Sequence, residues 1–133
     1  MDHFSYRKLD AYISSKDFVI FVYKLIVLFP REENYALCDQ LRRAVISIPS
    51  NIAEGMGRSS LKEQVHFLEI AFGSLNEVMC QLELANELNF ISQANLEEAE
   101  IHYQSIAKKL SGLRNKRLAL ISQKSPRPSP FPP

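Results

Sequence analysis

The stretch SIPSNIAEGMGRSS, residues 47–60, gathers residue types that active sites use: an amide, a carboxylate, a guanidinium and two glycines. Its second half resembles a phosphate-binding loop, but that loop requires a lysine and follows a β-strand, whereas this stretch lacks the lysine and follows a helical pattern. We therefore expect a structural role, in which Glu54 and Arg58 form an ion pair and the glycines make a turn. A polar patch for a partner or a nucleic acid is the functional alternative.

A polar stripe leads into this stretch at steps of 4, 4, 3 and 4 residues, parallel to an apolar one. Ser47 and Asn51 can satisfy backbone groups that Pro49 frees. If the next helix folds back antiparallel, Arg43 lies level with Gly73, which would leave room for its long side chain. We expect Arg43 to reach a carboxylate of that helix. The predicted structural polar network comprises Arg43, Ser47, Asn51, Glu54, Arg58, Glu69 and Glu77.

No spacing elsewhere predicts catalysis or metal binding. The histidines are isolated, and Glu63 and His66 supply one Glu-x-x-His pair where a di-metal bundle needs two. No Ser/His/Asp or Cys/His arrangement can be argued. Cys38 and Cys80 form no CxxC motif, so we expect two free, buried thiols in a reducing cytoplasm. We predict no enzyme activity, no metal and no cofactor.

The charges divide unevenly along the chain although its net charge is only +1. Residues 61–100 carry one basic and eight acidic side chains, whereas residues 101–133 carry seven basic and no acidic ones. The basic segment is a candidate surface for the phosphate backbone of RNA or DNA, without interleaved aromatic residues for base stacking. Alternatively it neutralises the acidic helix within a protein-interaction scaffold. The candidate nucleic-acid-binding residues are Lys108, Lys109, Arg114, Lys116 and Arg117, with Lys124 beyond them.

Four helical segments must position these residues, and they account for most of the chain. Apolar residues recur at steps of three and four over residues 31–54, 61–88 and 93–121, and residues 6–29 form a further helix that is apolar almost all round in its second half. The apolar phase continues through Pro49, which favours a kinked helix over a broken one. Short connections predict an all-α, antiparallel up-down-up-down four-helix bundle.

The bundle is expected to occupy residues 1–122. Residues 123–133 contain too many prolines for a helix and predict a disordered tail. The longest apolar run, residues 18–29, is too short to span a bilayer, so we predict no membrane partner. Because that run is apolar on more than one face, part of its cover can come from another subunit.

Two strings, QLRRAVISIPSNIAEGMGRSS (residues 40–60) and FLEIAFGSLNEVMCQLELA (residues 67–85), resemble the 23S ribosomal RNA intervening-sequence protein family. The resemblance covers residues 6–121. It implies a left-handed four-helix bundle without enzymatic activity that forms a homo-oligomer, with a five-subunit ring favoured. It also implies kinship with the accessory proteins of diversity-generating retroelements, which bind nucleic acid and a reverse transcriptase through basic surface. The matching positions are Arg42, Arg43, Ala44, Ser47, Ile48, Asn51, Ile52, Ala53, Glu54, Gly55, Arg58, Phe67, Leu68, Ile70, Ala71, Gly73, Ser74 and Glu77.

Overall fold

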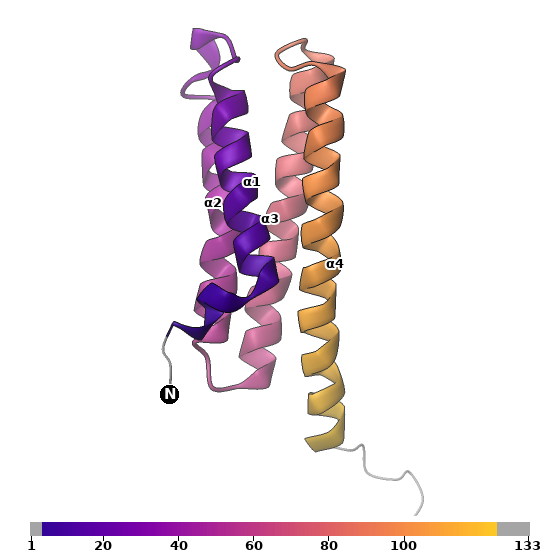
Figure 1. The fold of residues 1–133 in the computed structure, drawn as a ribbon. Coiled ribbons are helices and arrows are strands. Elements are labelled where there is room, and N and C mark those ends of the chain that lie inside the picture. Colours follow the sequence, from indigo (N-terminus) through magenta and orange to yellow (C-terminus); the bar gives the residue numbers. More distant parts are fainter. Residues whose placement is uncertain (1–3, 125–133) are drawn as a thin grey trace, which may run out of the picture.

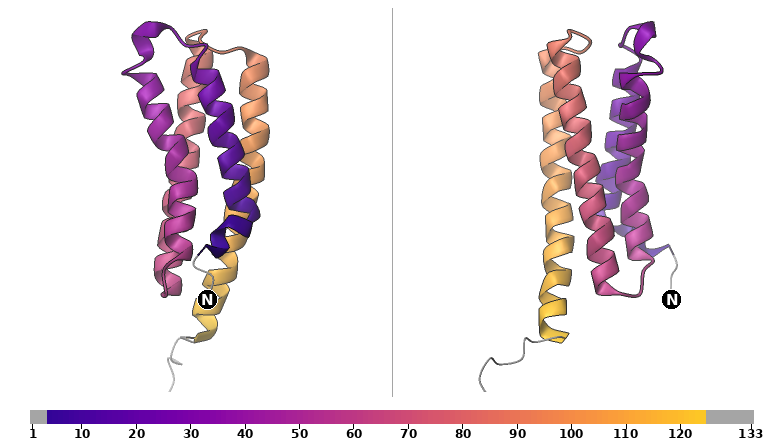
Figure 2. Two further views of the ribbon diagram at one scale, coloured as in Figure 1. Left: turned by 60° about the vertical axis from the view of Figure 1, so that its left-hand side comes forward. Right: turned by 180° about the vertical axis from the view of Figure 1, so that it is seen from behind.

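The computed structural model describes residues 4–124 and arranges them as four helices (Figure 1). The helices are α1 (Asp10–Ile26), α2 (Leu37–Met56), α3 (Leu61–Glu87) and α4 (Gln93–Lys124). Consecutive helices run in opposite directions, and α4 closes the bundle by packing against both α3 and α1 (Figures 1 and 2). The predicted up-down-up-down bundle is therefore confirmed.

The first helix begins later than predicted, because the helical backbone is interrupted at Leu9. A short 3₁₀ helix, η1 (Ser5–Lys8), precedes the break, and Leu9 itself is extended. The ring of Tyr6 meets that of Tyr12 edge-on, with 4.9 Å between centroids. This edge-on contact holds η1 against the start of α1, and η1 also contacts α2.

The second helix begins later than predicted. Residues 31–33 form a separate 3₁₀ turn, η2 (Arg31–Glu33), and α2 starts at Leu37. The two terminal guanidinium nitrogens of Arg42 donate to Asn34, at its carbonyl (3.1 Å) and its side-chain oxygen (2.7 Å), and hold this connection outside the helix. From Leu37 the helix is continuous through Pro49, so the prediction that it is not broken there is confirmed.

Side chains and backbone close the turns around α3. The hydroxyl of Ser60 caps α3 by accepting from the amide of Glu63. At the other end Asn89 adopts φ 63°, and the amide of Phe90 donates to the carbonyl of Ala85 at 2.8 Å. This pattern is a Schellman motif, which ends the helix and turns the chain into α4. Ser92 then caps α4 by accepting from the amide of Asn95.

The predicted apolar stripes form the core for most of their length. Phe18, Leu41, Leu75 and Ile106, one from each helix, are at most 1% exposed. The stripe on α4 fails at its end, where Leu120 is 37% exposed. The hydrogen bond between Tyr103 and Asn76 sets α4 against α3, so the end of α4 projects past the first residues of α3 (Figure 1). Helix α4 reaches Lys124, three residues beyond the predicted end, and the predicted disordered tail otherwise lies outside the described residues.

Candidate nucleic-acid interface

The polar stripe on α2 makes one compact cluster with α3. The hydroxyl oxygens of Ser47 and Ser74 lie 2.8 Å apart. The side-chain amide of Asn51 donates to both the hydroxyl (2.9 Å) and the carbonyl (2.8 Å) of Ser47. The carbonyl that Pro49 deprives of a helical partner belongs to Val45, so Asn51 does not satisfy the group for which it was proposed. Its bonds instead hold Ser47 of the same helix, whose hydroxyl contacts Ser74 of α3.

The predicted contact of Arg43 with Glu69 or Glu77 is wrong. Arg43 is 81% exposed and its partner is Asp39 on the same helix, at 3.7 Å. The bond between Ser47 and Ser74 shows that α3 is displaced by about one helical turn from the expected register, since its first turn lies beyond the end of α2. Gly73 is accordingly exposed, with no atom within 4 Å of where a Cβ would lie.

The glycines at the end of α2 act differently from the prediction. Neither Gly55 nor Gly57 has a positive φ, and Gly55 lies inside the helix. A Cβ on Gly55 would stand 2.8 Å from the Cβ of Phe67, so this glycine allows α2 and α3 to approach closely. The expected ion pair of Glu54 with Arg58 is present, and the Arg58 guanidinium also lies over the Phe67 ring.

Among the candidate basic residues, Arg117 is held against the bundle. Its Nε donates to Oε1 of Gln64 at 2.8 Å, and its other nitrogens reach the carbonyl of Leu113 and the sulfur of Met56. Burial lowers the pKa of the guanidinium below its ordinary value. Gln64 also donates to the carbonyl of Arg58, so its amide joins the α2–α3 turn to α4. The sequence signal for this role was the interruption of the α4 apolar stripe at Arg117.

Lys109 and Arg114 also lie partly within the bundle. The Lys109 ammonium donates to the hydroxyl of Ser14 on α1 at 2.6 Å. Arg114 is half-buried, and its Nε has no hydrogen-bond partner among residues 4–124. These two side chains therefore line the bundle as much as they face solvent.

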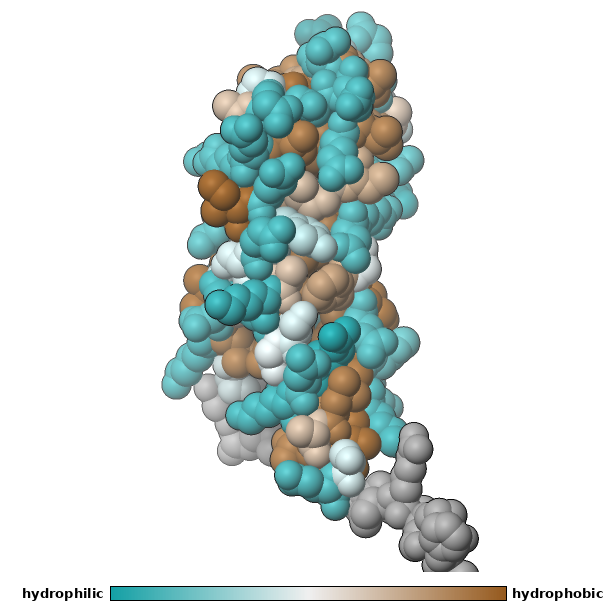
Figure 3. All heavy atoms as spheres, turned by 90° about the vertical axis from the view of Figure 1, so that its right-hand side faces the viewer, coloured by the Kyte–Doolittle hydropathy of each residue, from teal (hydrophilic) through white to brown (hydrophobic). Residues whose placement is uncertain are grey.

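Lys108 and Lys116 are exposed, and neither forms an ion pair with the described residues. They lie two helical turns apart on the outer side of α4, with exposed Gly112 midway between them. No atom lies within 4 Å of where a Gly112 Cβ would be. Figure 3 faces this side of the molecule and shows hydrophilic residues over much of it, with hydrophobic patches between them. Of the candidate nucleic-acid-binding residues whose side chains the structure describes, Lys108 and Lys116 are thus the two that remain as free, exposed cations.

The acidic and basic segments do not neutralise each other. The bonds from Tyr103 to Asn76 and from Arg117 to Gln64 set the register of α4 against α3. The acidic second half of α3 therefore lies beside the acidic start of α4, and the basic half of α4 lies beside the start of α3. Glu63 and Glu69 lie at the same end of the bundle as the basic half of α4, but they form no ion pair with it. The expected neutralisation of α3 by α4 is wrong, and the charges are separated along the bundle axis.

The two cysteines differ in their surroundings. Cys38 is buried in the core and burial raises the pKa of its thiol, an effect that nearby Arg42 partly opposes. Cys80 is free and exposed, so the prediction that both thiols are buried is wrong for Cys80.

A family model for the 23S rRNA-intervening sequence protein matches residues 7–112. The chain belongs to this family. A crystal structure of a protein of unknown function from the S23 ribosomal protein family of Bacteroides thetaiotaomicron VPI-5482 is similar in fold, with a TM-score of 0.58 and 22% identity over 84% of this chain and 97% of that one. None of the curated proteins matches the chain.

The family match ends at residue 112, before three of the five candidate nucleic-acid residues. Those three are Arg114, Lys116 and Arg117. The family therefore accounts for the bundle and for the α2–α3 cluster, whereas the basic end of α4 must be argued from its own geometry. Within residues 4–124, every helix is too short or too polar to cross a bilayer.

Proposed function

We propose that this chain is a non-enzymatic, cytoplasmic, self-associating accessory protein that binds the phosphate backbone of nucleic acid through the outer side of α4. The observation that carries the proposal is that Lys108 and Lys116 are exposed and form no ion pair with the described residues. Most acidic residues of α3 and α4 lie toward the other end of the bundle, and the two at this end, Glu63 and Glu69, form no ion pair with α4. Unpaired cations on one side of a helix attract a polyanion without reading its bases.

The shape of this surface supports the same reading. Gly112 leaves the helix backbone open between the two lysines, so a phosphate chain can come close to α4 without displacing a side chain. Each lysine that contacts a phosphate releases about one counterion. Binding should therefore be weak, independent of sequence and strongly dependent on salt.

Fluorescence anisotropy with a structured RNA and a single-stranded DNA, titrated at several salt concentrations, tests the proposal. We expect micromolar affinity that falls as salt rises, and loss of most binding in Lys108→Glu/Lys116→Glu. Arg117 is unsuitable for this test because its replacement would disturb packing. The matched control is Arg31→Glu/Arg43→Glu, which changes the net charge equally at exposed positions near the acidic end. Equal losses in both variants, or no binding at low salt, would contradict the proposal.

A protein-interaction scaffold is the second candidate. The observation that favours it is an apolar stripe along the outer face of α1 and its C-cap, where Ile13, Ile20 and the C-cap residue Val27 are 46%, 54% and 81% exposed. Absence of nucleic-acid binding together with retained self-association would favour this function.

A further inference from the structure

Aromatic rings and basic side chains alternate in space where η1 meets α1. The Arg7 guanidinium lies over the Phe4 ring, at 4.1 Å from its centroid. The Lys16 ammonium lies over the Tyr12 ring, at 5.2 Å from its centroid. Tyr6 connects the two pairs, since its ring meets those of Phe4 and Tyr12 edge-on, with 6.5 and 4.9 Å between centroids. The ring–cation row is the name used here for these residues, Phe4, Tyr6, Arg7, Tyr12 and Lys16.

The two ends of the ring–cation row are open to solvent. Phe4 is 52% exposed, and the side chains of Arg7 and Lys16 are exposed as well. Lys8 follows Arg7 in η1 and adds a third exposed cation. None of these three basic side chains forms an ion pair with residues 4–124. The row therefore offers positive charge and aromatic surface at one place.

A hollow of about 440 Å³ lies beside the Tyr12 ring, between α1 and α2. Tyr12 and Lys16 line it from α1. Pro49, Ser50 and Ala53 line it from α2, so its walls are mostly apolar with one hydroxyl and one ammonium among them. Such a lining is typical of sites for organic ligands that have an apolar body and a few polar groups. A nucleobase has this character, because its faces are apolar and its edge is polar.

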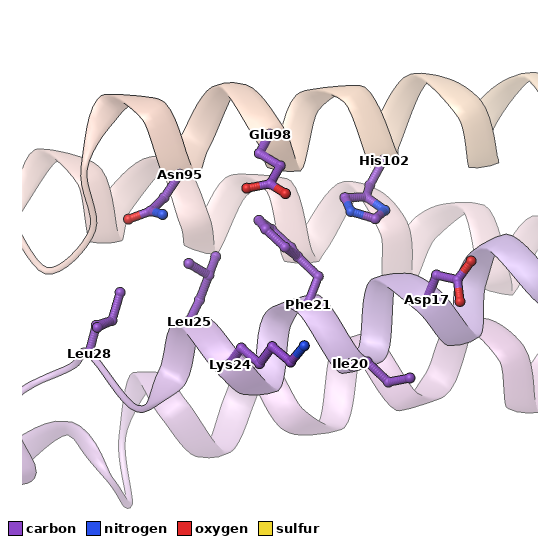
Figure 4. A pocket seen from close by; sticks show the side chains of 9 residues that line it. All are labelled: Asp17, Ile20, Phe21, Lys24, Leu25, Leu28, Asn95, Glu98 and His102. Carbon is purple, nitrogen blue, oxygen red and sulfur yellow. The ribbon is translucent and has the colours of Figure 1, made fainter.

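The other side of α1 is unfavourable for a polyanion. Asp17 of α1 and Glu98 of α4 line the pocket between these two helices, together with Lys24 and His102 (Figure 4). Neither carboxylate forms an ion pair with the part of the chain that the structure describes. Because like charges repel, a polyanion that approaches the start of α1 is directed away from this pocket and toward the ring–cation row.

The ring–cation row lies at the same end of the bundle as the basic half of α4 (Figure 1). The bond from Lys109 to Ser14 fixes this relation, because it places the basic half of α4 beside the start of α1. That half of α4 carries cations without aromatic rings between them, and the row supplies the rings. Rings combined with cations are typical of proteins that bind single strands, since unpaired bases stack on the rings while the cations hold the phosphates.

We propose that the ring–cation row stacks an unpaired base, so that the ligand of this chain is single-stranded nucleic acid. This inference rests on the proposed function and names the class of its ligand. Lys108 and Lys116 hold phosphates of the same strand at this end of the bundle. Stacking on a ring is tolerant of sequence, which agrees with binding that does not read the bases.

Two strands of equal charge separate stacking from phosphate binding. One is an oligothymidylate of about ten nucleotides, and the other is an abasic strand with the same number of phosphates. We expect the oligothymidylate to bind about tenfold more tightly, as measured by anisotropy in one buffer. Equal affinities would overturn the stacking and leave the proposed function intact. No binding of either strand at low salt would overturn the proposed function and this inference with it.

Pairing the bases gives a second comparison. Annealing the oligothymidylate to its complement doubles the phosphates but hides the bases inside a duplex. Contacts to phosphate alone would make the duplex bind at least as tightly as the single strand, whereas base stacking on the row requires that it bind less tightly. A duplex that binds more tightly than the single strand would overturn the preference for unpaired bases.

Two kinds of variant locate the contact. The chain has no tryptophan, so Phe4→Trp places a single fluorophore in the row, and the oligothymidylate should quench its emission whereas the abasic strand should not. Lys16→Glu should weaken binding of the oligothymidylate several-fold. The matched control is Lys24→Glu, which makes the same charge change two helical turns along α1 and should have little effect. Equal losses in the two lysine variants, or equal quenching by both strands, would overturn the row as the site.

Discussion

The guanidinium of Arg117 donates through Nε to Oε1 of Gln64 at 2.8 Å, which fastens the basic half of α4 to the start of α3. Because Gln64 also holds the carbonyl of Arg58, one side-chain amide connects α4, α3 and the turn that follows α2. One of the five predicted nucleic-acid-binding residues is therefore a structural clamp.

Replacing Arg117 should destabilise the protein. We expect Arg117→Ala to lower the free energy of unfolding by about 1–3 kcal/mol, because it removes hydrogen bonds made by a charged, half-buried group. Arg117→Lys should lose most of the same energy, since an ammonium cannot reach three partners as a planar guanidinium does. Urea denaturation measures both, with Lys116→Ala as the exposed neighbour that should change stability by less than about 0.5 kcal/mol. If the stability losses of Arg117→Ala and Gln64→Ala simply add in the double variant, the two side chains do not act together, which would contradict the clamp.

Replacing Gly55 and Gly73 with alanine should change the free energy of unfolding in opposite directions. Gly55→Ala places a Cβ 2.8 Å from that of Phe67, and the resulting strain of about 1–3 kcal/mol should exceed the roughly 1 kcal/mol gained in helix propensity. Gly73→Ala meets nothing within 4 Å and should stabilise the protein by about 0.5–1 kcal/mol. Thermal or urea unfolding checks the pair. A stabilised Gly55→Ala protein would show that the α2–α3 contact is looser than described.

Two residues of the polar stripe on α2 should differ in how much their replacement lowers stability. Arg43→Ala should change stability by less than about 0.5 kcal/mol, because its ion pair with Asp39 is exposed. Asn51→Ala should cost about 1–2 kcal/mol, since it removes two bonds to Ser47 beside the α3 contact. Chemical denaturation of both variants in one buffer makes the comparison. A larger loss for Arg43→Ala would restore the buried network that the sequence predicted.

The thiols should react at very different rates. At pH 8, iodoacetamide should label exposed Cys80 in the folded protein and Cys38 only after unfolding, as mass spectrometry can show. Burial raises the pKa of Cys38 above its ordinary 9.0, so the folded state holds this proton more tightly than the unfolded state does. The contribution of the Cys38 thiol to stability is therefore complete at pH values below the unfolded-state pKa. It is lost as the pH rises through the higher pKa of the folded state. Rapid double labelling of the folded protein would contradict this assignment.

The sequence predicted the bundle well because apolar periodicity reports which side of each helix is buried. It predicted local contacts equally well, such as the ion pair of Glu54 with Arg58, since its two partners lie within about one helical turn. It failed where the answer depends on how helices slide against each other. A displacement of about one turn in α3 moved Arg43 from a buried partner to solvent.

The candidate site was less predictable for a related reason. Lys108, Lys109 and Lys116 are chemically alike in the sequence, yet Lys109 bonds Ser14, a residue 95 positions away. Periodicity on α4 alone does not reveal which cations meet another helix. The interruption of the apolar stripe at Arg117 was a usable signal, but its partner Gln64 had no distinguishing pattern of its own.

The separation of charge along the bundle has a consequence for how the protein behaves at high concentration. With a net charge of only +1, the molecules have little overall repulsion to keep them apart. The acidic end of one molecule can attract the basic end of another at low ionic strength. Added salt weakens this attraction, because at 0.1 M charges more than about 10 Å apart are largely screened. The protein should therefore be salted in, dissolving better as salt is raised from low concentrations, which is the opposite of what a chain protected by a large net charge would do.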